Sequence, residues 1–361
     1  MTVPSVGLLF PPSREKMIAV ESREPASCAF ASVEDFTKKA SKCLTDRVLG
    51  RFELMSWMNW IYDSLGTSPK PEVAVRGTHH WYFLGDFYDA GMSKFRGLPP
   101  GALMPNTKEQ QFESILRILE KSGVPYVFSV TPDKPRVYPE FLPDWLVPGS
   151  GPSRVDEVLS RFHTKGYVGV SLKDVLVARR HKEDRGPLYL ETDSHWNYLG
   201  AFEGYKRVLS ELHSRFGLSL RGIQDADLTF RQEQGECDLA KLLQLSLPCT
   251  MMWPVGTNPN VFSPLVAVSA GTETPIGPFE YLEESLYLRM TKNDKALNGK
   301  RLLFINDSFG RALNPYLRQT FSSTVEIHYE SVFDGAATPL APLLEQYKPD
   351  VVLVNAVERI F

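Results

Sequence analysis

Residues 191–198 read Glu-Thr-Asp-Ser-His-Trp-Asn-Tyr and place a carboxylate, an imidazole and an indole within four consecutive positions. In an extended backbone, residues i and i+2 point to the same side of the chain, so Asp193 and His195 would emerge side by side. A carboxylate beside a histidine fixes the tautomer of the imidazole and stabilises the imidazolium. The stretch therefore predicts two members of a nucleophilic triad and lacks only the nucleophile.

A candidate nucleophile lies more than a hundred residues downstream, where residues 302–309 read Leu-Leu-Phe-Ile-Asn-Asp-Ser-Phe. The apolar run predicts a buried strand that ends at a small polar turn bearing Ser308. A turn from strand to helix leaves backbone N–H groups unpaired, and such groups can stabilise an oxyanion. Asn306 tolerates the backbone of a tight turn, and its amide is a further candidate donor. Taken singly, an Asn-Asp-Ser turn is also typical of a helix cap, and an Asp-x-His pair is common.

The composition is that of a globular protein without a nucleic-acid partner. Of the 361 residues, 43% are hydrophobic and 23% are charged, and the formal net charge is −3. Binding to nucleic acid usually requires a basic surface, which this balance does not supply. No stretch approaches the roughly 20 apolar residues of a membrane-spanning helix. Residues 6–10 are too short for a signal-peptide core, so we expect that the protein is not exported or that a leader has been removed.

Four cysteines bear on metal binding and on the redox environment. Cys28 and Cys43 lie early in the chain, Cys237 and Cys249 lie late, and none has CxxC spacing, so we predict no metal site. Four cysteines allow three full pairings. One long-range disulfide would suit an oxidising compartment, and four buried thiols are the alternative. The adjacent histidines 79–80 would point to opposite faces of a strand, so both could not chelate one ion without a bend.

Apolar runs alternate with amphipathic stretches along most of the chain. This alternation predicts an α/β fold with a mainly parallel sheet and helices on both faces. Residues 1–30 are expected to form an irregular lead-in and 31–361 a single domain, with 218–300 as a peripheral insertion or a return hairpin. The expected strands are 72–75, 125–130, 301–305, 324–328 and 351–355, and the expected helices are 32–65, 107–122, 154–165, 199–216, 315–321 and 340–347.

Two local patterns refine this outline. Asn314 followed by Pro315 is typical of an N-cap and a first helical position, so we expect a helix to start there. The proline-rich loop 131–140 follows the strand predicted at 125–130. Because ligands usually bind at the carboxyl ends of strands in α/β proteins, Lys134 and Tyr138 are candidates for a cleft, with an ordinary surface loop as the alternative.

With these motifs in order along the chain, the sequence resembles the alginate O-acetyltransferase family, the AlgJ/AlgX-like branch of the SGNH hydrolase superfamily. The resemblance covers nearly the whole chain, and its most specific pieces are 192–196 with Gly200-Ala201, and 306–309. Further matching pieces are 21–25, 45–47 with Arg51, 75–77, 81–84, 132–134, 138–140, 142–143, 347–352 and 358–359.

The resemblance implies an SGNH-hydrolase-like fold and a triad of Asp193, His195 and Ser308. The acid and the histidine precede the serine in the chain, as in that family and in reverse of ordinary SGNH esterases. Asn306 stands where the serine motif of the family usually has glycine, which affects the oxyanion turn. The chain ends without a carbohydrate-binding module, so single-domain members are expected to be the nearer relatives.

The implied activity is O-acetyl transfer through an acetyl-serine intermediate onto hydroxyls of an exopolysaccharide, alginate-like or other, without a cofactor. A membrane-bound acyltransferase would supply the acetyl group in the periplasm or another extracytoplasmic compartment. Trp196 is expected to pack beneath the site, with sugar binding as the alternative. Arg359 is expected to brace the fold, with the cleft as the alternative. The alternatives are an SGNH-type carbohydrate acetyl esterase, which uses the same triad, and a non-catalytic glycan-binding subunit of a modification complex.

Overall fold

The computed structural model describes Arg14, Met17 and residues 24–29, 31–48, 50–97, 107–182, 186–257, 260–269, 271–280, 289–333 and 339–361. Most of the predicted lead-in, including the matching piece at 21–23, lies outside the described residues. No helix in the described part of the chain is both long and apolar enough to cross a bilayer.

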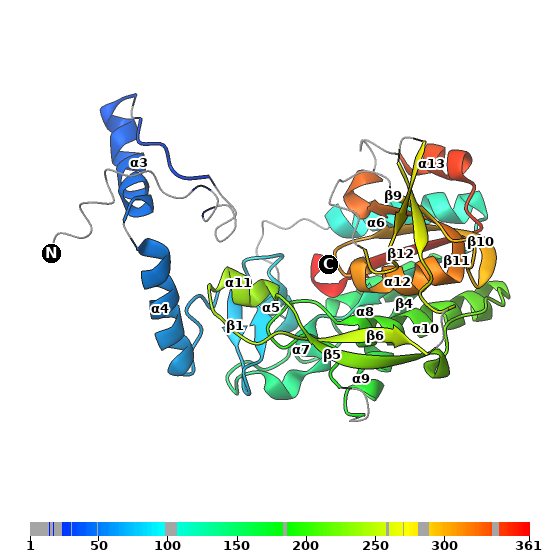
Figure 1. Ribbon diagram of the computed structural model, residues 1–361, viewed down its shortest axis with the longest axis horizontal. Coiled ribbons are helices and arrows are strands. Elements are labelled where there is room, and N and C mark those ends of the chain that lie inside the picture. Colours follow the sequence, from blue (N-terminus) through cyan, green and yellow to red (C-terminus); the bar gives the residue numbers. More distant parts are fainter. Residues whose placement is uncertain are drawn as a thin grey trace.

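An eight-stranded sheet with the order β4-β3-β12-β10-β11-β9-β7-β8 forms the centre of the molecule (Figure 1). The five strands from β4 to β11 run parallel, which confirms the predicted mainly parallel sheet, and β9, β7 and β8 continue it antiparallel. Every residue of β3 and β12 is buried, as expected for strands covered on both faces. The strands are β3 (Tyr126–Thr131), β4 (Gly169–Ser171), β7 (Leu265–Ser269), β8 (Thr272–Ile276), β9 (Arg289–Lys292), β10 (Asn298–Asn306), β11 (Phe321–His328) and β12 (Val351–Val357).

Helices cover both faces of the sheet. α6 (Thr107–Ser122) and α13 (Leu340–Tyr347) lie on one face, and α10 (Tyr198–Phe216) and α12 (Gly310–Thr320) lie on the other (Figure 1). The helical period of α6 brings Phe112, Ile115, Leu116 and Leu119 into the core. The remaining helices of this body are α5 (Gly91–Phe95), α7 (Lys134–Val137), α8 (Arg154–Thr164), α9 (Lys173–Arg179) and α11 (Asp238–Leu242).

The helix predicted to start at Asn314-Pro315 starts earlier, at Gly310, and Pro315 lies inside it. Asn314 does not cap because its side chain is buried and donates from Nδ2 to Glu326 Oε2 at 2.7 Å. The helix therefore begins two residues after Ser308, which brings its N-terminal N–H groups close to the predicted nucleophile.

Segment 218–300 contributes to two sheets. β5 (Leu228–Gln234) and β6 (Thr250–Gly256) pair antiparallel as a separate two-stranded sheet, and α11 lies between them in sequence. β7, β8 and β9 instead extend the central sheet. The segment is thus only partly peripheral, because three of its strands pair with the core.

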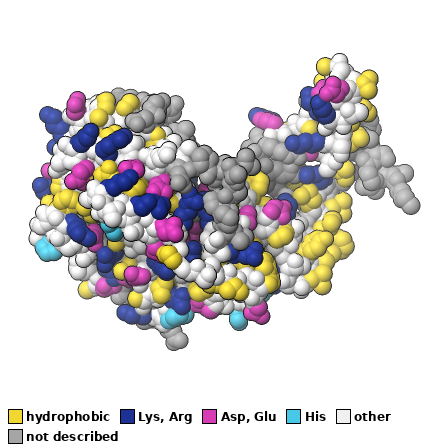
Figure 2. Space-filling view, turned by 180° about the vertical axis from the view of Figure 1, so that it is seen from behind, with side chains coloured by type: hydrophobic (Ala, Val, Ile, Leu, Met, Phe, Trp, Pro, Cys, Tyr) yellow, Lys and Arg dark blue, Asp and Glu magenta, His cyan; other side chains and the backbone are white. Residues whose placement is uncertain are grey.

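The helix expected at 32–65 is two helices, α3 (Val33–Asp46) and α4 (Arg51–Ser64), which we call the arm. The chain turns between them at Gly50, whose φ of 69° suits glycine. The arm projects from the body (Figure 1), and Figure 2 shows hydrophobic side chains gathered on its outer face. Its exposed apolar residues include Phe36, Leu44, Leu54, Trp57, Met58, Trp60, Tyr62 and Leu65.

The polar face of α4 is the one that contacts the body. Asn59 Nδ2 donates to the Leu243 carbonyl at 2.6 Å, and Ser56 Oγ donates to the Gln244 carbonyl at 3.1 Å. Asp63 accepts from Arg76 Nε at 2.6 Å and also binds the Tyr82 hydroxyl. β1 (Ala74–Arg76) and β2 (Tyr82–Leu84), which carry these two partners, form a small antiparallel sheet.

Candidate active site

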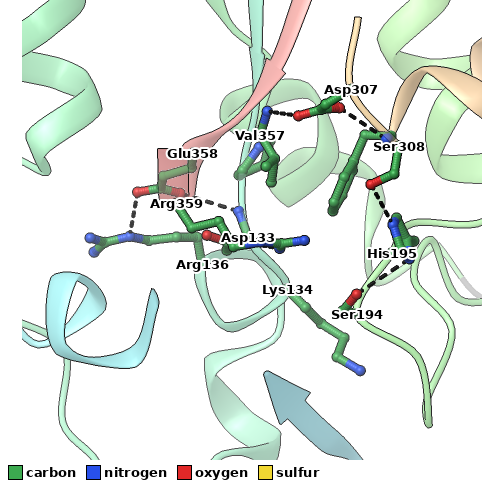
Figure 3. A network of polar contacts seen from close by, with 12 residues as sticks. Asp133, Lys134, Arg136, Ser194, His195, Asp307, Ser308, Val357, Glu358 and Arg359 are labelled. Carbon is green, nitrogen blue, oxygen red and sulfur yellow. Dashed lines mark hydrogen bonds and ion pairs between the residues drawn. The ribbon is translucent and has the colours of Figure 1, made fainter. Parts of the chain in front are cut away.

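Three neighbouring parallel strands end at the same edge of the sheet and carry one cluster of polar side chains (Figure 3). Ser308 follows β10, Arg359 follows β12 and Lys134 follows β3. His195 reaches this edge from the loop that precedes α10. Ligands of open α/β sheets bind outside the carboxyl ends of the strands, so this edge is the candidate active site.

Asp193 and Ser308 each lie within hydrogen-bonding distance of His195. His195 Nδ1 is 2.7 Å from Asp193 Oδ1, and His195 Nε2 is 2.8 Å from Ser308 Oγ. Residues 191–195 form turns and bends, not the extended backbone that we assumed. The acid and the histidine meet because Asp193 Oδ1 also accepts the backbone N–H of His195 at 2.9 Å.

Trp196 packs beneath this site. Its side chain is buried, and its indole Nε1 donates to the Phe309 carbonyl at 2.9 Å, which joins the histidine loop to the serine turn. Gly200 allows the close approach, because a Cβ there would lie 2.4 Å from the Leu188 carbonyl oxygen and 3.3 Å from Trp196 Cβ. With this burial, Trp196 presents almost no surface to a sugar.

Lys134 and Tyr138, the candidates for the cleft, are buried as well. Lys134 Nζ donates to three backbone carbonyls within residues 190–193 at 2.6 to 3.0 Å. The Tyr138 hydroxyl accepts from the Leu188 N–H at 2.9 Å. Burial lowers the pKa of Lys134 to about 7. Both side chains support the loop that carries His195, and the expectation that they contact a glycan does not agree with their burial.

The serine turn is held from behind by Asp307. Its carboxylate accepts the N–H of Phe309 at 2.9 Å and the N–H of Val357 at 2.7 Å (Figure 3). Burial raises the pKa of Asp307 although both hydrogen bonds oppose the shift. This side chain therefore joins the ends of β10 and β12 directly behind Ser308.

Asn306, the further candidate oxyanion donor, lies in the same turn. Its Nδ2 is 3.4 Å from the Phe304 carbonyl, a long contact that leaves the amide weakly held. The amide packs on the first turn of α12, where a Cβ on Gly310 would lie 2.5 Å from Asn306 Cγ. The residue that departs from the family pattern thus fits because position 310 is glycine.

Two buried ion pairs brace the loops beside the turn. Arg359 pairs with Asp133 at 2.5 Å, and Arg136 pairs with Glu358 at 2.9 Å (Figure 3). The Arg359 guanidinium also lies over the Phe309 ring, 5.1 Å from its centroid. This arrangement agrees with the expectation that Arg359 braces the fold.

A second carboxylate, which no sequence pattern indicated, contacts the histidine. Asp238 Oδ2 lies 3.4 Å from His195 Nδ1 and 2.5 Å from Ser194 Oγ. Asp238 follows Cys237, which forms a disulfide with Cys249. We call residues 237–249 the clamp. The only local signal for Asp238 was its place beside a cysteine, which carries no information about a distant histidine.

The disulfides are both local. Cys28 pairs with Cys43 and Cys237 pairs with Cys249, so all four cysteines of the chain are paired. This is one of the three full pairings that four cysteines allow, and the alternatives of one long-range disulfide and of four buried thiols are both wrong.

The electrostatics of the site favour the imidazolium. Burial lowers the pKa of His195, but the hydrogen bond to Asp193 and the nearby negative charges of Asp193 and Asp238 outweigh burial and raise the pKa to about 9. Burial also raises the pKa of Asp238, yet its contacts with His195 and Ser194 take the pKa well below its usual range. The two carboxylates that flank the histidine thus stabilise its protonated form.

These same groups are the place where a metal would bind among the described residues. Asp193, His195 and Asp238 offer ligand atoms that all lie within 4.8 Å of one another. Each of these atoms already takes part in the hydrogen bonds given above, and the other imidazole nitrogen faces Ser308. The arrangement therefore matches a proton-transfer chain better than an open coordination site.

Comparisons with known proteins identify relatives of this chain. The chain is 32% identical to the probable alginate O-acetylase AlgJ of Pseudomonas aeruginosa over 143 residues, which are 40% of this chain and 34% of that protein. It is 31% identical to the AlgJ of Pseudomonas putida over 113 residues, 31% of this chain and 28% of that protein. The matches thus span about a third of the relatives' length.

Solved structures and a family match complete the comparison. Bacillus cereus PatB1 aligns with a TM-score of 0.55 at 17% identity, over 79% of this chain and 96% of that one, which shows a shared fold. The same protein with a sulfonyl adduct aligns with a TM-score of 0.54 at 18% identity, over 79% and 93% of the two chains. Residues 74–255, half of this chain, match the family described as SGNH hydrolase-like domain, acetyltransferase AlgX. The protein is therefore a member of this AlgX family of SGNH hydrolase-like domains.

Proposed function

We propose that this protein is a serine-dependent O-acetyltransferase that moves an acetyl group onto hydroxyls of a polysaccharide. The observation that carries the proposal is the chain of two hydrogen bonds from Asp193 through His195 to Ser308, at 2.7 and 2.8 Å. The AlgX family match and the names of the AlgJ relatives support the choice of acetyl as the group transferred.

The proposed reaction has two displacements. Neutral His195 takes the proton of Ser308 as Oγ attacks the acetyl carbonyl, and the imidazolium then protonates the leaving group of the donor. In the second displacement His195 removes a proton from a sugar hydroxyl, whose oxygen attacks the carbonyl carbon of the acetyl-serine. The bond from the acetyl carbon to Ser308 Oγ breaks, and the imidazolium returns the proton to Ser308 Oγ, 2.8 Å away. Asp193 orients the imidazole and stabilises its cation in both steps.

The oxyanion of each tetrahedral intermediate would lie beside the start of α12. The N–H groups of Phe309, Gly310 and Arg311 already donate to Asp307 Oδ1, the Asp307 carbonyl and the Ser308 carbonyl. The helix therefore contributes the partial positive charge of its N-terminus. The weakly held amide of Asn306 lies in the same turn and is our candidate for an additional donor. One such donor typically lowers the barrier by about 3–4 kcal/mol.

The acceptor and the donor are proposed on chemical grounds and on the relatives. The AlgJ relatives carry alginate in their names, so we propose an alginate-like or other exopolysaccharide as acceptor. Two disulfides fit an oxidising, extracytoplasmic compartment such as the periplasm. Acetyl-CoA would not be directly accessible there, so we propose a membrane-bound acyltransferase as the source of acetyl groups.

The proposal is tested with an activated acetyl ester such as 4-nitrophenyl acetate, with and without alginate or cellulose oligosaccharides. Acetylated oligosaccharide detected by mass spectrometry supports transfer. Release of acetate at the same rate with and without an oligosaccharide supports the esterase. A wild-type protein that neither acetylates sugar nor releases acetate supports a glycan-binding subunit. Each assay is repeated after dialysis against EDTA, and unchanged rates are expected because no step uses a metal.

Ser308→Ala is the decisive variant. We expect turnover to fall by about 10⁴-fold or more, with an unchanged circular dichroism spectrum. PatB1 has been solved with a sulfonyl adduct, so a sulfonyl fluoride is a fitting second probe. Its mass should attach to the peptide that contains Ser308 in the wild type and be absent from Ser308→Ala. Wild-type turnover in Ser308→Ala would exclude Ser308 as the nucleophile.

A further inference from the structure

We propose that Asp238 is a positioning residue for His195, a second carboxylate that acts on imidazole Nδ1 beside Asp193. This inference rests on the proposed function, because it assigns Asp238 a part in the same proton transfer. Asp238 lies outside residues 191–198 and 302–309, the two stretches that carry the triad.

The contacts of Asp238 are directional and reciprocal. Its Oδ1 accepts the backbone N–H of Ser194 at 2.7 Å, and its Oδ2 accepts the Ser194 hydroxyl at 2.5 Å. The backbone N–H of Asp238 donates in return to Asp193 Oδ2 at 2.7 Å. Asp193 and Asp238 are therefore fixed to each other and to the loop that presents His195.

Two adjacent carboxylates repel each other unless a cation or N–H donors lie between them. Here His195 Nδ1 lies 2.7 Å from Asp193 and 3.4 Å from Asp238, so both acids face the positive charge that proton transfer creates. Their surroundings differ, because the Asp193 side chain is 9% exposed and the Asp238 side chain is 34% exposed. Asp193 serves as the buried acid and Asp238 as the acid on the solvent side.

The clamp explains how Asp238 is held in this position. Cys237, the residue immediately before Asp238, is held by its disulfide with Cys249. The Ala240 N–H donates to the Thr192 carbonyl at 3.2 Å, and Thr192 Oγ1 donates to the Pro248 carbonyl at 2.9 Å. Both ends of the clamp thus contact the loop that carries Asp193 and His195.

Other charged groups also interact with the pair of His195 and Asp238. Asp307 lies behind the serine turn, Lys134 lies beneath the histidine loop, and Arg359 lies beyond Phe309. The electrostatic interactions of these three groups reach the His195 and Asp238 pair. None of these three described side chains makes a hydrogen bond to the imidazole, whereas Asp193 does, and Asp238 pairs with it at 3.4 Å.

Removal of the Asp238 charge should therefore change the pH at which His195 becomes an effective base. A carboxylate within about 4 Å raises the pKa of a histidine by roughly one unit or more. A plot of kcat/KM against pH rises where His195 loses its proton, and we call this rise the acid limb. In Asp238→Asn the acid limb should move to lower pH by about one unit. A less basic, less well oriented imidazole should also lower the high-pH plateau, by roughly tenfold.

The experiment measures kcat/KM for 4-nitrophenyl acetate from pH 5 to 10 in the wild type, Asp238→Asn, Asp238→Ala and Asp238→Glu. Glu236→Gln is the matched control, because this exposed carboxylate lies two residues away and pairs with Lys241. We expect the acid limb to move in the Asn and Ala variants, to return towards wild type in the Glu variant, and to stay in place in the control. An acid limb at the wild-type pH in Asp238→Asn would overturn the proposal.

NMR titration of histidine in the same proteins gives a readout that does not depend on turnover. The pKa of His195 should be lower in Asp238→Asn than in the wild type, and equal values would also overturn the proposal. A failure of the proposed function would give a different result. Ser308→Ala would then keep wild-type turnover, while Asp238→Asn would still change the pKa of His195. If Asp238→Ala does not fold, the isosteric Asn variant carries the test alone.

Discussion

The arm and the clamp each carry a disulfide, and the two loops are of similar length. Cys28–Cys43, which ties the chain before α3 to the arm, has a sequence separation of 15, and Cys237–Cys249, which closes the clamp, has one of 12. In the chain-entropy account, loops of this size contribute about 3 kcal/mol each. Their neighbours differ: Cys43 lies on α3, in the projecting arm, whereas Cys237 precedes the carboxylate that faces His195. The effect of a disulfide on the active site therefore depends on which residues lie beside the disulfide.

Removal of each disulfide separately should therefore give the largest contrast. In Cys237→Ser/Cys249→Ser we expect kcat/KM at neutral pH to change at least tenfold and the acid limb to move as in Asp238→Asn, because Asp238 loses its anchor. In Cys28→Ser/Cys43→Ser we expect turnover within twofold of wild type.

Thermal unfolding supplies the control for this pair. Both double variants should be destabilised, by about 3 kcal/mol where the loop unfolds together with the rest of the protein. If the two double variants are equally stable but differ in turnover, the difference comes from the position of Asp238 and not from global unfolding. Equal effects of the two double variants on turnover would show that the contrast between arm and clamp is wrong.

The pH dependence of stability sharpens the comparison on the side of the clamp. The pKa of His195 is raised to about 9 in the folded protein, from an unfolded value of roughly 6.5. The folded state thus binds the proton more tightly, so the stabilisation is complete below about pH 6.5 and is lost as pH rises through about 9. Because the side chain is 27% exposed, we expect a contribution of about 1–3 kcal/mol.

Urea unfolding at pH 6 and pH 10 measures this contribution in the wild type and in His195→Gln. The stability advantage of the wild type over the variant should be larger at pH 6 than at pH 10. The difference between the two proteins isolates His195, since the other groups with shifted pKa values, Lys134 and Glu358 among them, are present in both. An advantage that grows towards pH 10 would contradict a raised pKa of His195 in the folded state.

The sequence predicted those parts of the site that depend on local patterns. The apolar runs located β3, β10 and β12, and the motifs at 191–198 and 302–309 identified the residues whose side chains meet. Asp238 was missed because its contact with Ser194 joins residues 44 positions apart. Lys134 was a candidate for a cleft, with a surface loop as the alternative, because a local pattern cannot show that three carbonyls enclose its amine.

The arm shows the same limit of sequence patterns. The spacing of its apolar residues correctly predicted helices. Spacing does not show whether the apolar face of a helix packs against the body or is exposed. In α4 the polar face contacts the body and the apolar face is exposed. The helix start at Asn314 failed for a related reason, since the buried partner of that side chain lies on β11.

A smaller effect is expected at the junction of arm and clamp. Asn59→Ala removes the buried hydrogen bond from α4 to the Leu243 carbonyl. The unpaired carbonyl should cost about 1–2 kcal/mol, measured by urea unfolding. Because Leu243 lies within the clamp, a small change in turnover should accompany the loss. Ser64→Ala on the exposed end of α4 is the control, and equal stability of the two variants would exclude this junction as a stabilising contact.

The smallest effect is expected at an exposed apolar side chain of the arm. Trp57 is 59% exposed on α4, so Trp57→Gln removes little buried area, and the stability of the isolated protein should change by less than about 0.5 kcal/mol. Trp196→Gln is the matched control, because the same substitution there empties a buried volume and breaks the bond to the Phe309 carbonyl, at a cost of about 3–5 kcal/mol. Thermal unfolding of both variants compares an exposed with a buried indole. A loss in Trp57→Gln as large as in Trp196→Gln would mean that the Trp57 side chain is covered in solution.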